Sequence, residues 1–289
     1  MDSYQAMVES APNLINRIRL VFNPVQHISR HARVDAAKGW RPEALPMNFR
    51  HMKRRRLLLL SNSTNHGGSF LSHAEPALPA FLGDGSREVL FVPYAGVRVS
   101  FDAYEAKVAE RFEALGYTIR SIHRAADPLA AVADAQAIAV GGGNTFQLLT
   151  RLAGAGLLEA IRARVHDGMP YVGWSAGSNL ACPTIMTTND MPIAEPPNFD
   201  ALDLVPFQIN PHYTDAVTPE HGGETRDDRL LEFVTANPAM PVLGLREGSM
   251  LRLEDGVLTL LGEYPARVFR YRRDAYAVTP GASLQFLLG

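Results

Sequence analysis

A serine flanked by glycines is the first place where this sequence could do chemistry. Gly173-Trp174-Ser175-Ala176-Gly177 follows a short apolar run and precedes a helix-compatible stretch. The pattern G-x-S-x-G on a strand-to-helix turn holds a serine in a strained conformation that exposes its hydroxyl, and small flanking residues are needed there. Such a hydroxyl can attack a carbonyl carbon. Because a tight structural turn produces the same short pattern, other residues must decide between the two interpretations.

Three consecutive glycines, Gly141 to Gly143, end a second apolar run and precede Asn144. Backbone N–H groups in such a run can approach a ligand closely and point at an anion. The run fits neither G-x-x-x-x-G-K-[ST] nor G-x-G-x-x-G, so a nucleotide is not expected. The alternatives are an oxyanion hole, with Gly142 or Gly143 as donor, and a plain tight turn.

A serine nucleophile needs a base, and the base needs an orienting acceptor. His212 is favoured because it ends another strand-like run, whereas His221 lies in a glycine-rich polar loop. Asp190 in "TTNDMP" and Glu247 in "LREGS" are both candidates for the acid, and the residues by themselves do not choose between them.

Short apolar runs that alternate with helical patterns must position these groups. An amphipathic helix is predicted over 101–115, with Ser100 as its N-cap and Gly116 at its exit. Near-continuous apolar strands between helices indicate an α/β fold with three layers, α/β/α, and a mostly parallel sheet. The predicted strands are 57–60, 88–92, 117–122, 137–140 and 170–173.

The C-terminal third predicts an antiparallel edge on that sheet. A strand is expected at 241–245, and Asp255-Gly256 between two apolar runs is a strong hairpin signal. The body, residues 57–289, is therefore expected to be a single domain.

Charge separates the N-terminal segment from this body. Residues 1–56 carry eleven Lys or Arg against four Asp or Glu, whereas the remainder carries seventeen against twenty-six. We expect residues 1–56 to be an N-terminal extension, disordered or derived from a mis-assigned start. The acidic body argues against a nucleic-acid partner. No apolar run is long enough for a membrane span, and the single cysteine, Cys182, is compatible with a reducing, cytoplasmic compartment.

Several of these stretches occur together in one known family. "GGGNTFQLL", "GWSAGSNLACPT", "TTNDMP", "INPHYT" and "GETRDDR" appear here in the order and spacing typical of peptidase E, the α-aspartyl dipeptidase family of serine peptidases. The resemblance begins near residue 57 and is less distinct beyond about residue 250. One departure is Ser178, where the family more often has alanine.

The resemblance implies a fold like that of class I glutamine amidotransferases and a metal-independent enzyme without a cofactor. It implies Ser175 as nucleophile, His212 as base, and Asp190 or Glu247 as the third member. It also implies an oxyanion hole formed by Gly143 and the N–H of Ala176.

The implied substrates are small peptides, dipeptides with an N-terminal aspartate, whose β-carboxylate needs a cationic or amide partner. Arg226 in "GETRDDR" can grip a carboxylate with two N–H groups, and Asn144 can add a donor. A surface ion pair with Asp227 or Asp228 is the alternative role for Arg226. The enzyme is expected to be a monomer or a homodimer. A cyanophycinase-like exopeptidase acting on β-aspartyl bonds and a non-catalytic binding protein on the same scaffold are the competing hypotheses.

Overall fold

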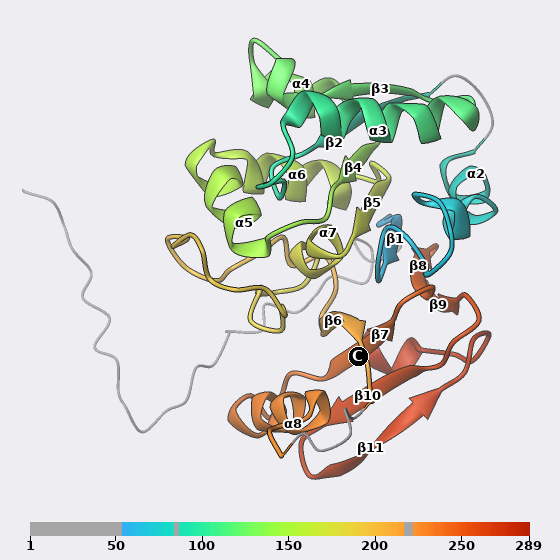
Figure 1. Cartoon of the computed structure of the whole chain (residues 1–289), viewed down its shortest axis with the longest axis vertical. Helices are drawn as coiled ribbons and strands as arrows, with labels where there is room; N and C mark the ends of the chain where they lie inside the picture. Colours follow the sequence, from blue (N-terminus) through green and yellow to red (C-terminus); the bar gives the residue numbers. More distant parts are fainter. Residues whose placement is uncertain (1–53, 84–86, 217–221) are drawn as a thin grey trace, which may run out of the picture. The chain divides into compact units, whose positions relative to one another are not determined.

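A seven-stranded sheet forms the centre of the part of the chain that the computed structural model describes, residues 54–83, 87–216 and 222–289 (Figure 1). Its order is β3-β2-β4-β5-β1-β8-β9, and the first five of these strands are parallel. The strands are β1 (Leu57–Leu60), β2 (Glu88–Val92), β3 (Thr118–Ser121), β4 (Ile138–Val140), β5 (Tyr171–Trp174), β8 (Met250–Glu254) and β9 (Val257–Leu261). The five strands predicted in the N-terminal half of the body are confirmed, with small shifts at their ends.

Helices cover both faces of this sheet, which confirms the three-layer arrangement. Side chains of α2 and α3 pack with Leu58 and Leu60 of β1 on one face, whereas those of α4 to α7 pack with Leu57 and Leu59 on the other. The helices are α2 (Ala77–Leu82), α3 (Phe101–Ala114), α4 (Pro128–Asp134), α5 (Thr145–Gly154), α6 (Leu157–His166) and α7 (Ala176–Leu180), with short 3₁₀ turns at Ser72–Ala74, Ile122–Arg124 and Gln285–Leu287. The Ser100 side chain accepts a hydrogen bond from the N–H of Ala103, so the predicted cap of α3 is present.

The predicted hairpin forms the antiparallel edge of the sheet. Strands β8 and β9 pair antiparallel around Asp255 and Gly256, which have φ angles of 53° and 78°. Both values are positive, as a two-residue type I′ turn requires. Strand β8 also pairs antiparallel with β1, and this pairing joins the hairpin to the parallel part.

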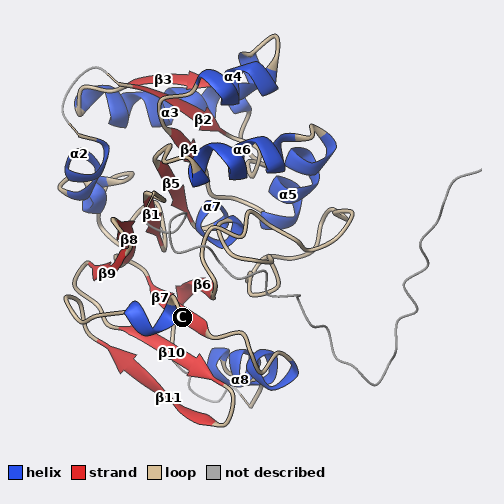
Figure 2. Cartoon of the chain, turned by 180° about the vertical axis from the view of Figure 1, so that it is seen from behind, coloured by secondary structure: helices blue, strands red, loops and turns tan. Residues whose placement is uncertain are grey.

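A second sheet, absent from the sequence prediction, contains the predicted strand at 241–245. Its order is β11-β10-β7-β6, with β6 (Gln208–Tyr213) parallel to β7 (Val242–Arg246). The strands β10 (Ala266–Arg270) and β11 (Arg273–Val278) complete it by antiparallel pairing. Helix α8 (Arg226–Ala236) packs on this sheet through Leu230 and Val234. Figure 2 shows this helix beside β10 from behind.

The boundary expected at residue 56 falls inside the folded body. Arg55 is buried and donates a hydrogen bond to the carbonyl of Leu204, and Nε of Arg56 donates to Glu254 at 2.8 Å. Residues 1–53 of the expected extension lie outside the described residues.

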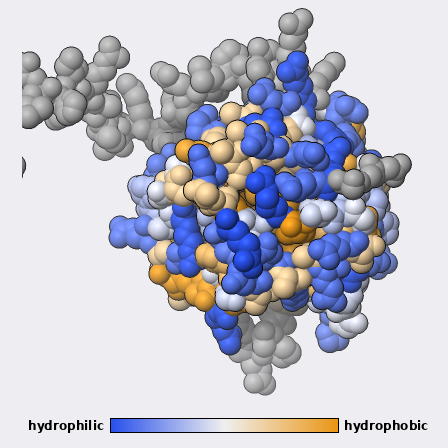
Figure 3. All heavy atoms as spheres, turned by 90° about the horizontal axis from the view of Figure 1, so that it is seen from above, coloured by the Kyte–Doolittle hydropathy of each residue, from blue (hydrophilic) through white to orange (hydrophobic). Residues whose placement is uncertain are grey.

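On the face drawn in Figure 3, hydrophilic side chains predominate and apolar ones form small patches between them. Within the described ranges, no helix has both the length and the apolar character that a membrane span requires.

Candidate active site

Ser175 lies at the carboxyl end of β5, on the turn into α7. Its φ and ψ angles are 53° and −113°, a region that non-glycine residues rarely adopt. The backbone carbonyl of Leu60 in the neighbouring strand accepts the Ser175 N–H at 3.1 Å. A Cβ atom on Gly177 would lie 2.1 Å from the carbonyl oxygen of Val140, so the second glycine of the motif is required by close packing. The serine therefore has the backbone geometry of a nucleophile elbow.

His212 and Glu247 reach Ser175 from the second sheet. The Nε2 atom of His212 is 2.9 Å from Oγ of Ser175, and its Nδ1 is 2.7 Å from Oε1 of Glu247. His212 belongs to β6, and Glu247 directly follows β7, the parallel neighbour of β6. The three groups form a continuous hydroxyl–imidazole–carboxylate chain, the arrangement that activates a serine for attack.

Asp190, the other candidate acid, has different partners. Its Oδ2 accepts hydrogen bonds from the N–H of Thr145 at 2.7 Å, from the Thr145 hydroxyl at 2.6 Å and from the Thr188 hydroxyl at 3.1 Å. Thr145 is the first residue of α5, so this carboxylate binds at a helix N-terminus, where negative charge is stabilised. It is Glu247, and not Asp190, that hydrogen bonds to the imidazole.

The glycine run lies next to the serine at the end of β4. Gly143 has a φ angle of 137°, and a Cβ atom there would lie 2.2 Å from the carbonyl oxygen of Ala95. Within the described part of the chain, the N–H groups of Gly142 and Gly143 have no hydrogen-bond acceptor. Ala176 is the first residue of α7, where N–H groups also lack an intrahelical acceptor. Free donors therefore lie on both strand ends beside Ser175, as an oxyanion hole requires.

Tyr104 supports the glycine run from behind. Its hydroxyl donates to the carbonyl of Gly142 at 3.1 Å and accepts from Nε1 of Trp174 at 2.9 Å. Burial raises the pKa of Tyr104 to about 12, so the phenol stays neutral and keeps its proton for Gly142.

Comparisons with known proteins identify the family of this chain. Residues 57–261 match peptidase family S51. Peptidase E of Nostoc sp. is 47% identical over 234 residues, which cover 81% of this chain and 97% of that protein. Peptidase E of Salmonella newport is 49% identical over 225 residues, which cover 78% of this chain and 98% of that protein. The chain belongs to peptidase family S51. It is thus a peptidase.

The solved structure of a peptidase from an acI-B1 actinobacterium shows the same fold as this S51 peptidase. The two superpose with a TM-score of 0.59 at 17% identity, over 80% of this chain and 96% of the other. At this identity the likeness concerns the fold alone.

A cavity of about 860 Å³ opens over Ser175 of the S51 peptidase. His212, the glycine run, Asn144 and Asp190 line it, together with two cationic side chains, Arg98 and Lys107. Sequence reasoning missed both cations. Lys107 is the single lysine after residue 56, and this isolated lysine in an acidic body is the sequence feature that could have indicated it. Its Nζ lies 4.5 Å from the ring centroid of Phe70, another lining residue, so the aromatic ring holds the ammonium group at the cavity.

The two residues proposed for substrate binding are placed differently. Asn144 lines the cavity, but its Oδ1 accepts from the N–H of Gln147 at 3.0 Å and its Nδ2 donates to the carbonyl of Met191 at 2.8 Å. Its side chain therefore caps α5 and holds the loop after Asp190. Arg226 begins α8 and does not line the cavity.

The alternative role for Arg226, a surface ion pair, is not what the structure shows. Asp227 instead bonds to Arg267 at 2.9 Å, and Asp228 caps the helix through Thr225. Among the described residues Arg226 has neither an ion pair nor a hydrogen bond, and burial together with the nearby charge of Arg229 lowers its pKa. His221, the weaker candidate base, lies outside the described residues.

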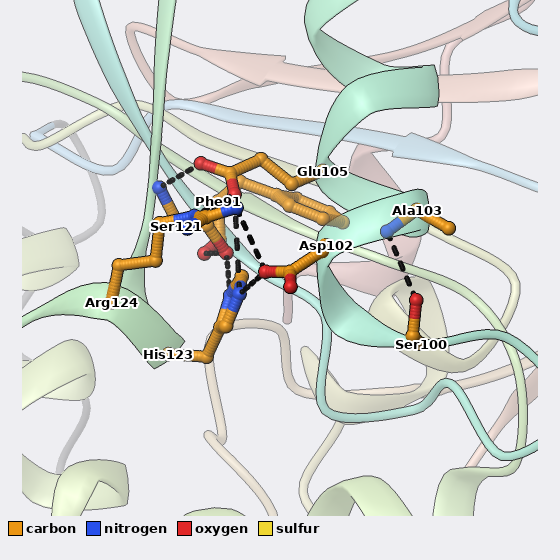
Figure 4. A network of polar contacts seen from close by, with 8 residues as sticks. All are labelled: Phe91, Ser100, Asp102, Ala103, Glu105, Ser121, His123 and Arg124. Carbon is orange, nitrogen blue, oxygen red and sulfur yellow. Dashed lines mark hydrogen bonds and ion pairs between the residues drawn. The ribbon is translucent and has the colours of Figure 1, made fainter.

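A second polar cluster of this S51 peptidase joins α3 to the end of β3 (Figure 4). Asp102, Glu105 and His123 bring ligand atoms within 4.8 Å of one another. However, Arg124 binds both carboxylates, at 2.8 and 2.5 Å, and the His123 ring lies 2.6 Å from Oγ of Ser121. The hydrogen bond with His123 and the charge of Arg124 lower the pKa of Asp102. Because these groups already bond to one another, we assign the cluster a structural role, in which it attaches α3 to the end of β3.

Proposed function

We propose that this S51 peptidase is a metal-independent serine dipeptidase that hydrolyses dipeptides with an N-terminal aspartate, Asp-X. The observation that supports it most is the chain from Ser175 Oγ through His212 to Glu247, at 2.9 and 2.7 Å. The similarity to peptidase E proteins supports the dipeptide substrates. A cytoplasmic location, inferred from the single cysteine, belongs to the same proposal.

In the proposed mechanism, Oγ of Ser175 attacks the carbonyl carbon of the aspartyl residue while its proton passes to Nε2 of His212. Glu247 accepts the Nδ1–H of the imidazole and stabilises the positive charge that forms on the ring. N–H groups of Gly143 and Ala176 bind the oxyanion. The C–N bond then breaks, and His212 returns the proton to the leaving amine.

An ester between Ser175 and aspartate remains after this step. Water attacks the ester carbonyl, and His212 takes the proton of the water. The C–Oγ bond breaks, the proton passes to Oγ, and free aspartate leaves the restored enzyme.

The β-carboxylate of the substrate needs a cationic partner, and three side chains are candidates. Arg98 and Lys107 line the cavity over Ser175. Arg226, the residue to which the family resemblance points, has a guanidinium with no partner among the described residues. We propose that at least one of the three binds this carboxylate.

A dipeptide panel tests the function. Purified wild-type protein is assayed on Asp-Leu, Ala-Leu and β-aspartyl-leucine, with and without a chelator, beside Ser175→Ala. Hydrolysis of Asp-Leu that persists with the chelator and disappears in Ser175→Ala is expected. Cleavage confined to the β-aspartyl substrate would support the cyanophycinase-like alternative, and binding without turnover would support a binding protein.

A further inference from the structure

The two residues that follow β1, Ser61 and Asn62, lie at the junction of the two sheets. Both are buried, with 0% and 1% of their surface exposed. The N–H of Ser61 donates to the carbonyl of Ser249 at 3.0 Å and extends the pairing of β1 with β8. The backbone of Ser61 is therefore fixed in the first sheet, while its side chain binds the second sheet and the side chain of Asn62 binds the turn that follows β7.

The hydroxyl of Ser61 fills an irregularity in the pairing of β6 with β7. Asn210 pairs with Gly244 and Tyr213 with Arg246, so Pro211 and His212 together lie opposite Leu245. Such a bulge disrupts the ladder locally and re-aims a side chain. Oγ of Ser61 accepts the N–H of His212 at 2.8 Å and donates to the carbonyl of Leu245 at 2.7 Å. One hydroxyl thus satisfies a donor and an acceptor on the two sides of the bulge.

His212 depends on this contact more than an ordinary strand residue does. Its φ angle is 53°, a left-handed conformation that histidine adopts only with support from its surroundings. Since Pro211 has no N–H, the N–H of His212 is the backbone donor of the bulge, and Ser61 accepts it. Without the hydroxyl, a partly buried N–H loses its partner and the bulge loses the bond that closes it.

Asn62 fixes the backbone beside the acid in the same way. Its Oδ1 accepts the N–H of Gly248, the residue after Glu247, at 2.8 Å. Its Nδ2 donates to the carbonyl of Thr64 at 2.9 Å and to Oδ1 of Asn65 at 2.8 Å, so the amide cannot turn freely. The side chains of two consecutive residues thereby hold the backbones that carry the base and the acid.

We propose that Ser61 and Asn62 are positioning residues of the catalytic site, which place His212 and Glu247 of the second sheet against Ser175 of the first. This inference rests on the proposed function for its kinetic consequence. Misplacing a catalytic group by about 1 Å costs roughly 100-fold in rate. Neither residue lies between the reacting groups, so substrate binding depends on them far less than turnover does.

The test compares two buried serines whose hydroxyls have different hydrogen-bond partners. Ser61→Ala removes the bond to His212, whereas Ser249→Ala removes a bond from an equally buried hydroxyl to the carbonyl of Tyr264 at 3.0 Å. On Asp-Leu we expect Ser61→Ala to lower kcat about 10- to 100-fold with KM within about twofold, and Ser249→Ala to change neither. Ser61→Thr, which keeps the hydroxyl, should recover most of the lost kcat.

A second readout separates this inference from the proposed function. NMR shifts of the His212 ring should change in Ser61→Ala and stay unchanged in Ser249→Ala, whether or not Asp-Leu is a substrate. Wild-type protein that fails to cleave Asp-Leu contradicts the function alone. A folded Ser61→Ala protein with wild-type kcat and ring shifts overturns the inference. Should Ser61→Ala fail to fold, Asn62→Ala takes its place in the comparison with Ser249→Ala. We expect Asn62→Ala to lower kcat about tenfold. A folded Asn62→Ala protein with wild-type kcat and wild-type ring shifts would contradict the inference.

Discussion

The two sheets contribute to the site in different ways. In the first sheet, Ser175 and the glycine run lie at the ends of adjacent parallel strands, and each owes its backbone conformation to glycines within its own short motif. In the second, His212 sits on a bulge of β6 and Glu247 follows β7, and both backbones are held by residues near position 61. The turn that carries the nucleophile is thus specified by a short sequence motif, whereas the base and acid are positioned by residues about 150 or more positions earlier in the chain. Substitutions at the junction of the two sheets, at Ser61 and Asn62, are therefore expected to affect His212 and Glu247 more than Ser175.

The largest expected effect tests whether the two halves act as one unit. Ser175→Ala and His212→Ala should each lower kcat on Asp-Leu by about 10⁴-fold or more, and the double variant should be no slower than either. The reason is that the Ser175 hydroxyl is a weak nucleophile without the base, and the base has no hydroxyl to deprotonate without Ser175. Circular dichroism checks that each variant is folded. Additive losses in the double variant would mean that the two sheets contribute independently.

The next effect tests which carboxylate serves the base. Glu247→Gln should lower kcat about 100-fold or more, because the neutral amide neither stabilises the imidazolium nor fixes its tautomer. Asp190→Asn should instead lower stability by about 1–2 kcal/mol, since charge is lost at the N-terminus of α5. Steady-state kinetics and thermal melts of both variants make the comparison. If Asp190→Asn lost the greater part of kcat, the role given to Glu247 would be wrong.

A smaller effect tests whether the first sheet also supplies the charge that binds substrate. Lys107→Met and Arg98→Met remove the cations of the cavity, and Arg226→Met removes the cation at the start of α8. We expect the residue that binds the β-carboxylate to lower kcat/KM on Asp-Leu about 10- to 100-fold while leaving any cleavage of Ala-Leu unchanged. Equal losses on both substrates for all three variants would exclude an arginine or lysine clamp at these positions.

The smallest effect concerns the hydroxyl of Ser178 on the helix side of the elbow. Ser178 is buried, and its Oγ lies 2.6 Å from the carbonyl oxygen of Leu60 and 2.9 Å from that of Gly173. Ser178→Ala should cost about 1 kcal/mol of stability, the usual worth of a buried hydrogen bond, and leave kcat within about twofold. Urea unfolding measures the first and peptide kinetics the second. A large fall in kcat would show that the elbow, too, needs support from β1.

Much of the first sheet could be predicted because its signals are local. The spacing of Phe101, Tyr104, Val108 and Phe112 placed one face of α3 in the core, and Asp255-Gly256 placed the hairpin. The second sheet could not be predicted, because short apolar runs such as those of β6 and β7 show that a strand forms but not which strand it joins. Arg98 and Lys107 were missed for a related reason, since neither belongs to a motif.

By itself, the sequence determined the strand-to-helix turn at Ser175, the glycine run beside it and the choice of His212 as the partner of the serine. The first two depend on backbone conformations that small residues permit within a few positions, and the histidine was chosen because it ends a strand-like run. Tertiary structure alone decided that Glu247 contacts His212 while Asp190 binds the start of α5. Neither "TTNDMP" nor "LREGS" indicates which partner its carboxylate has, and the pairing of β6 with β7 brings Glu247 to the imidazole. It also decided that Ser61 and Asn62, about 150 residues or more before the groups they hold, join the two halves of the site.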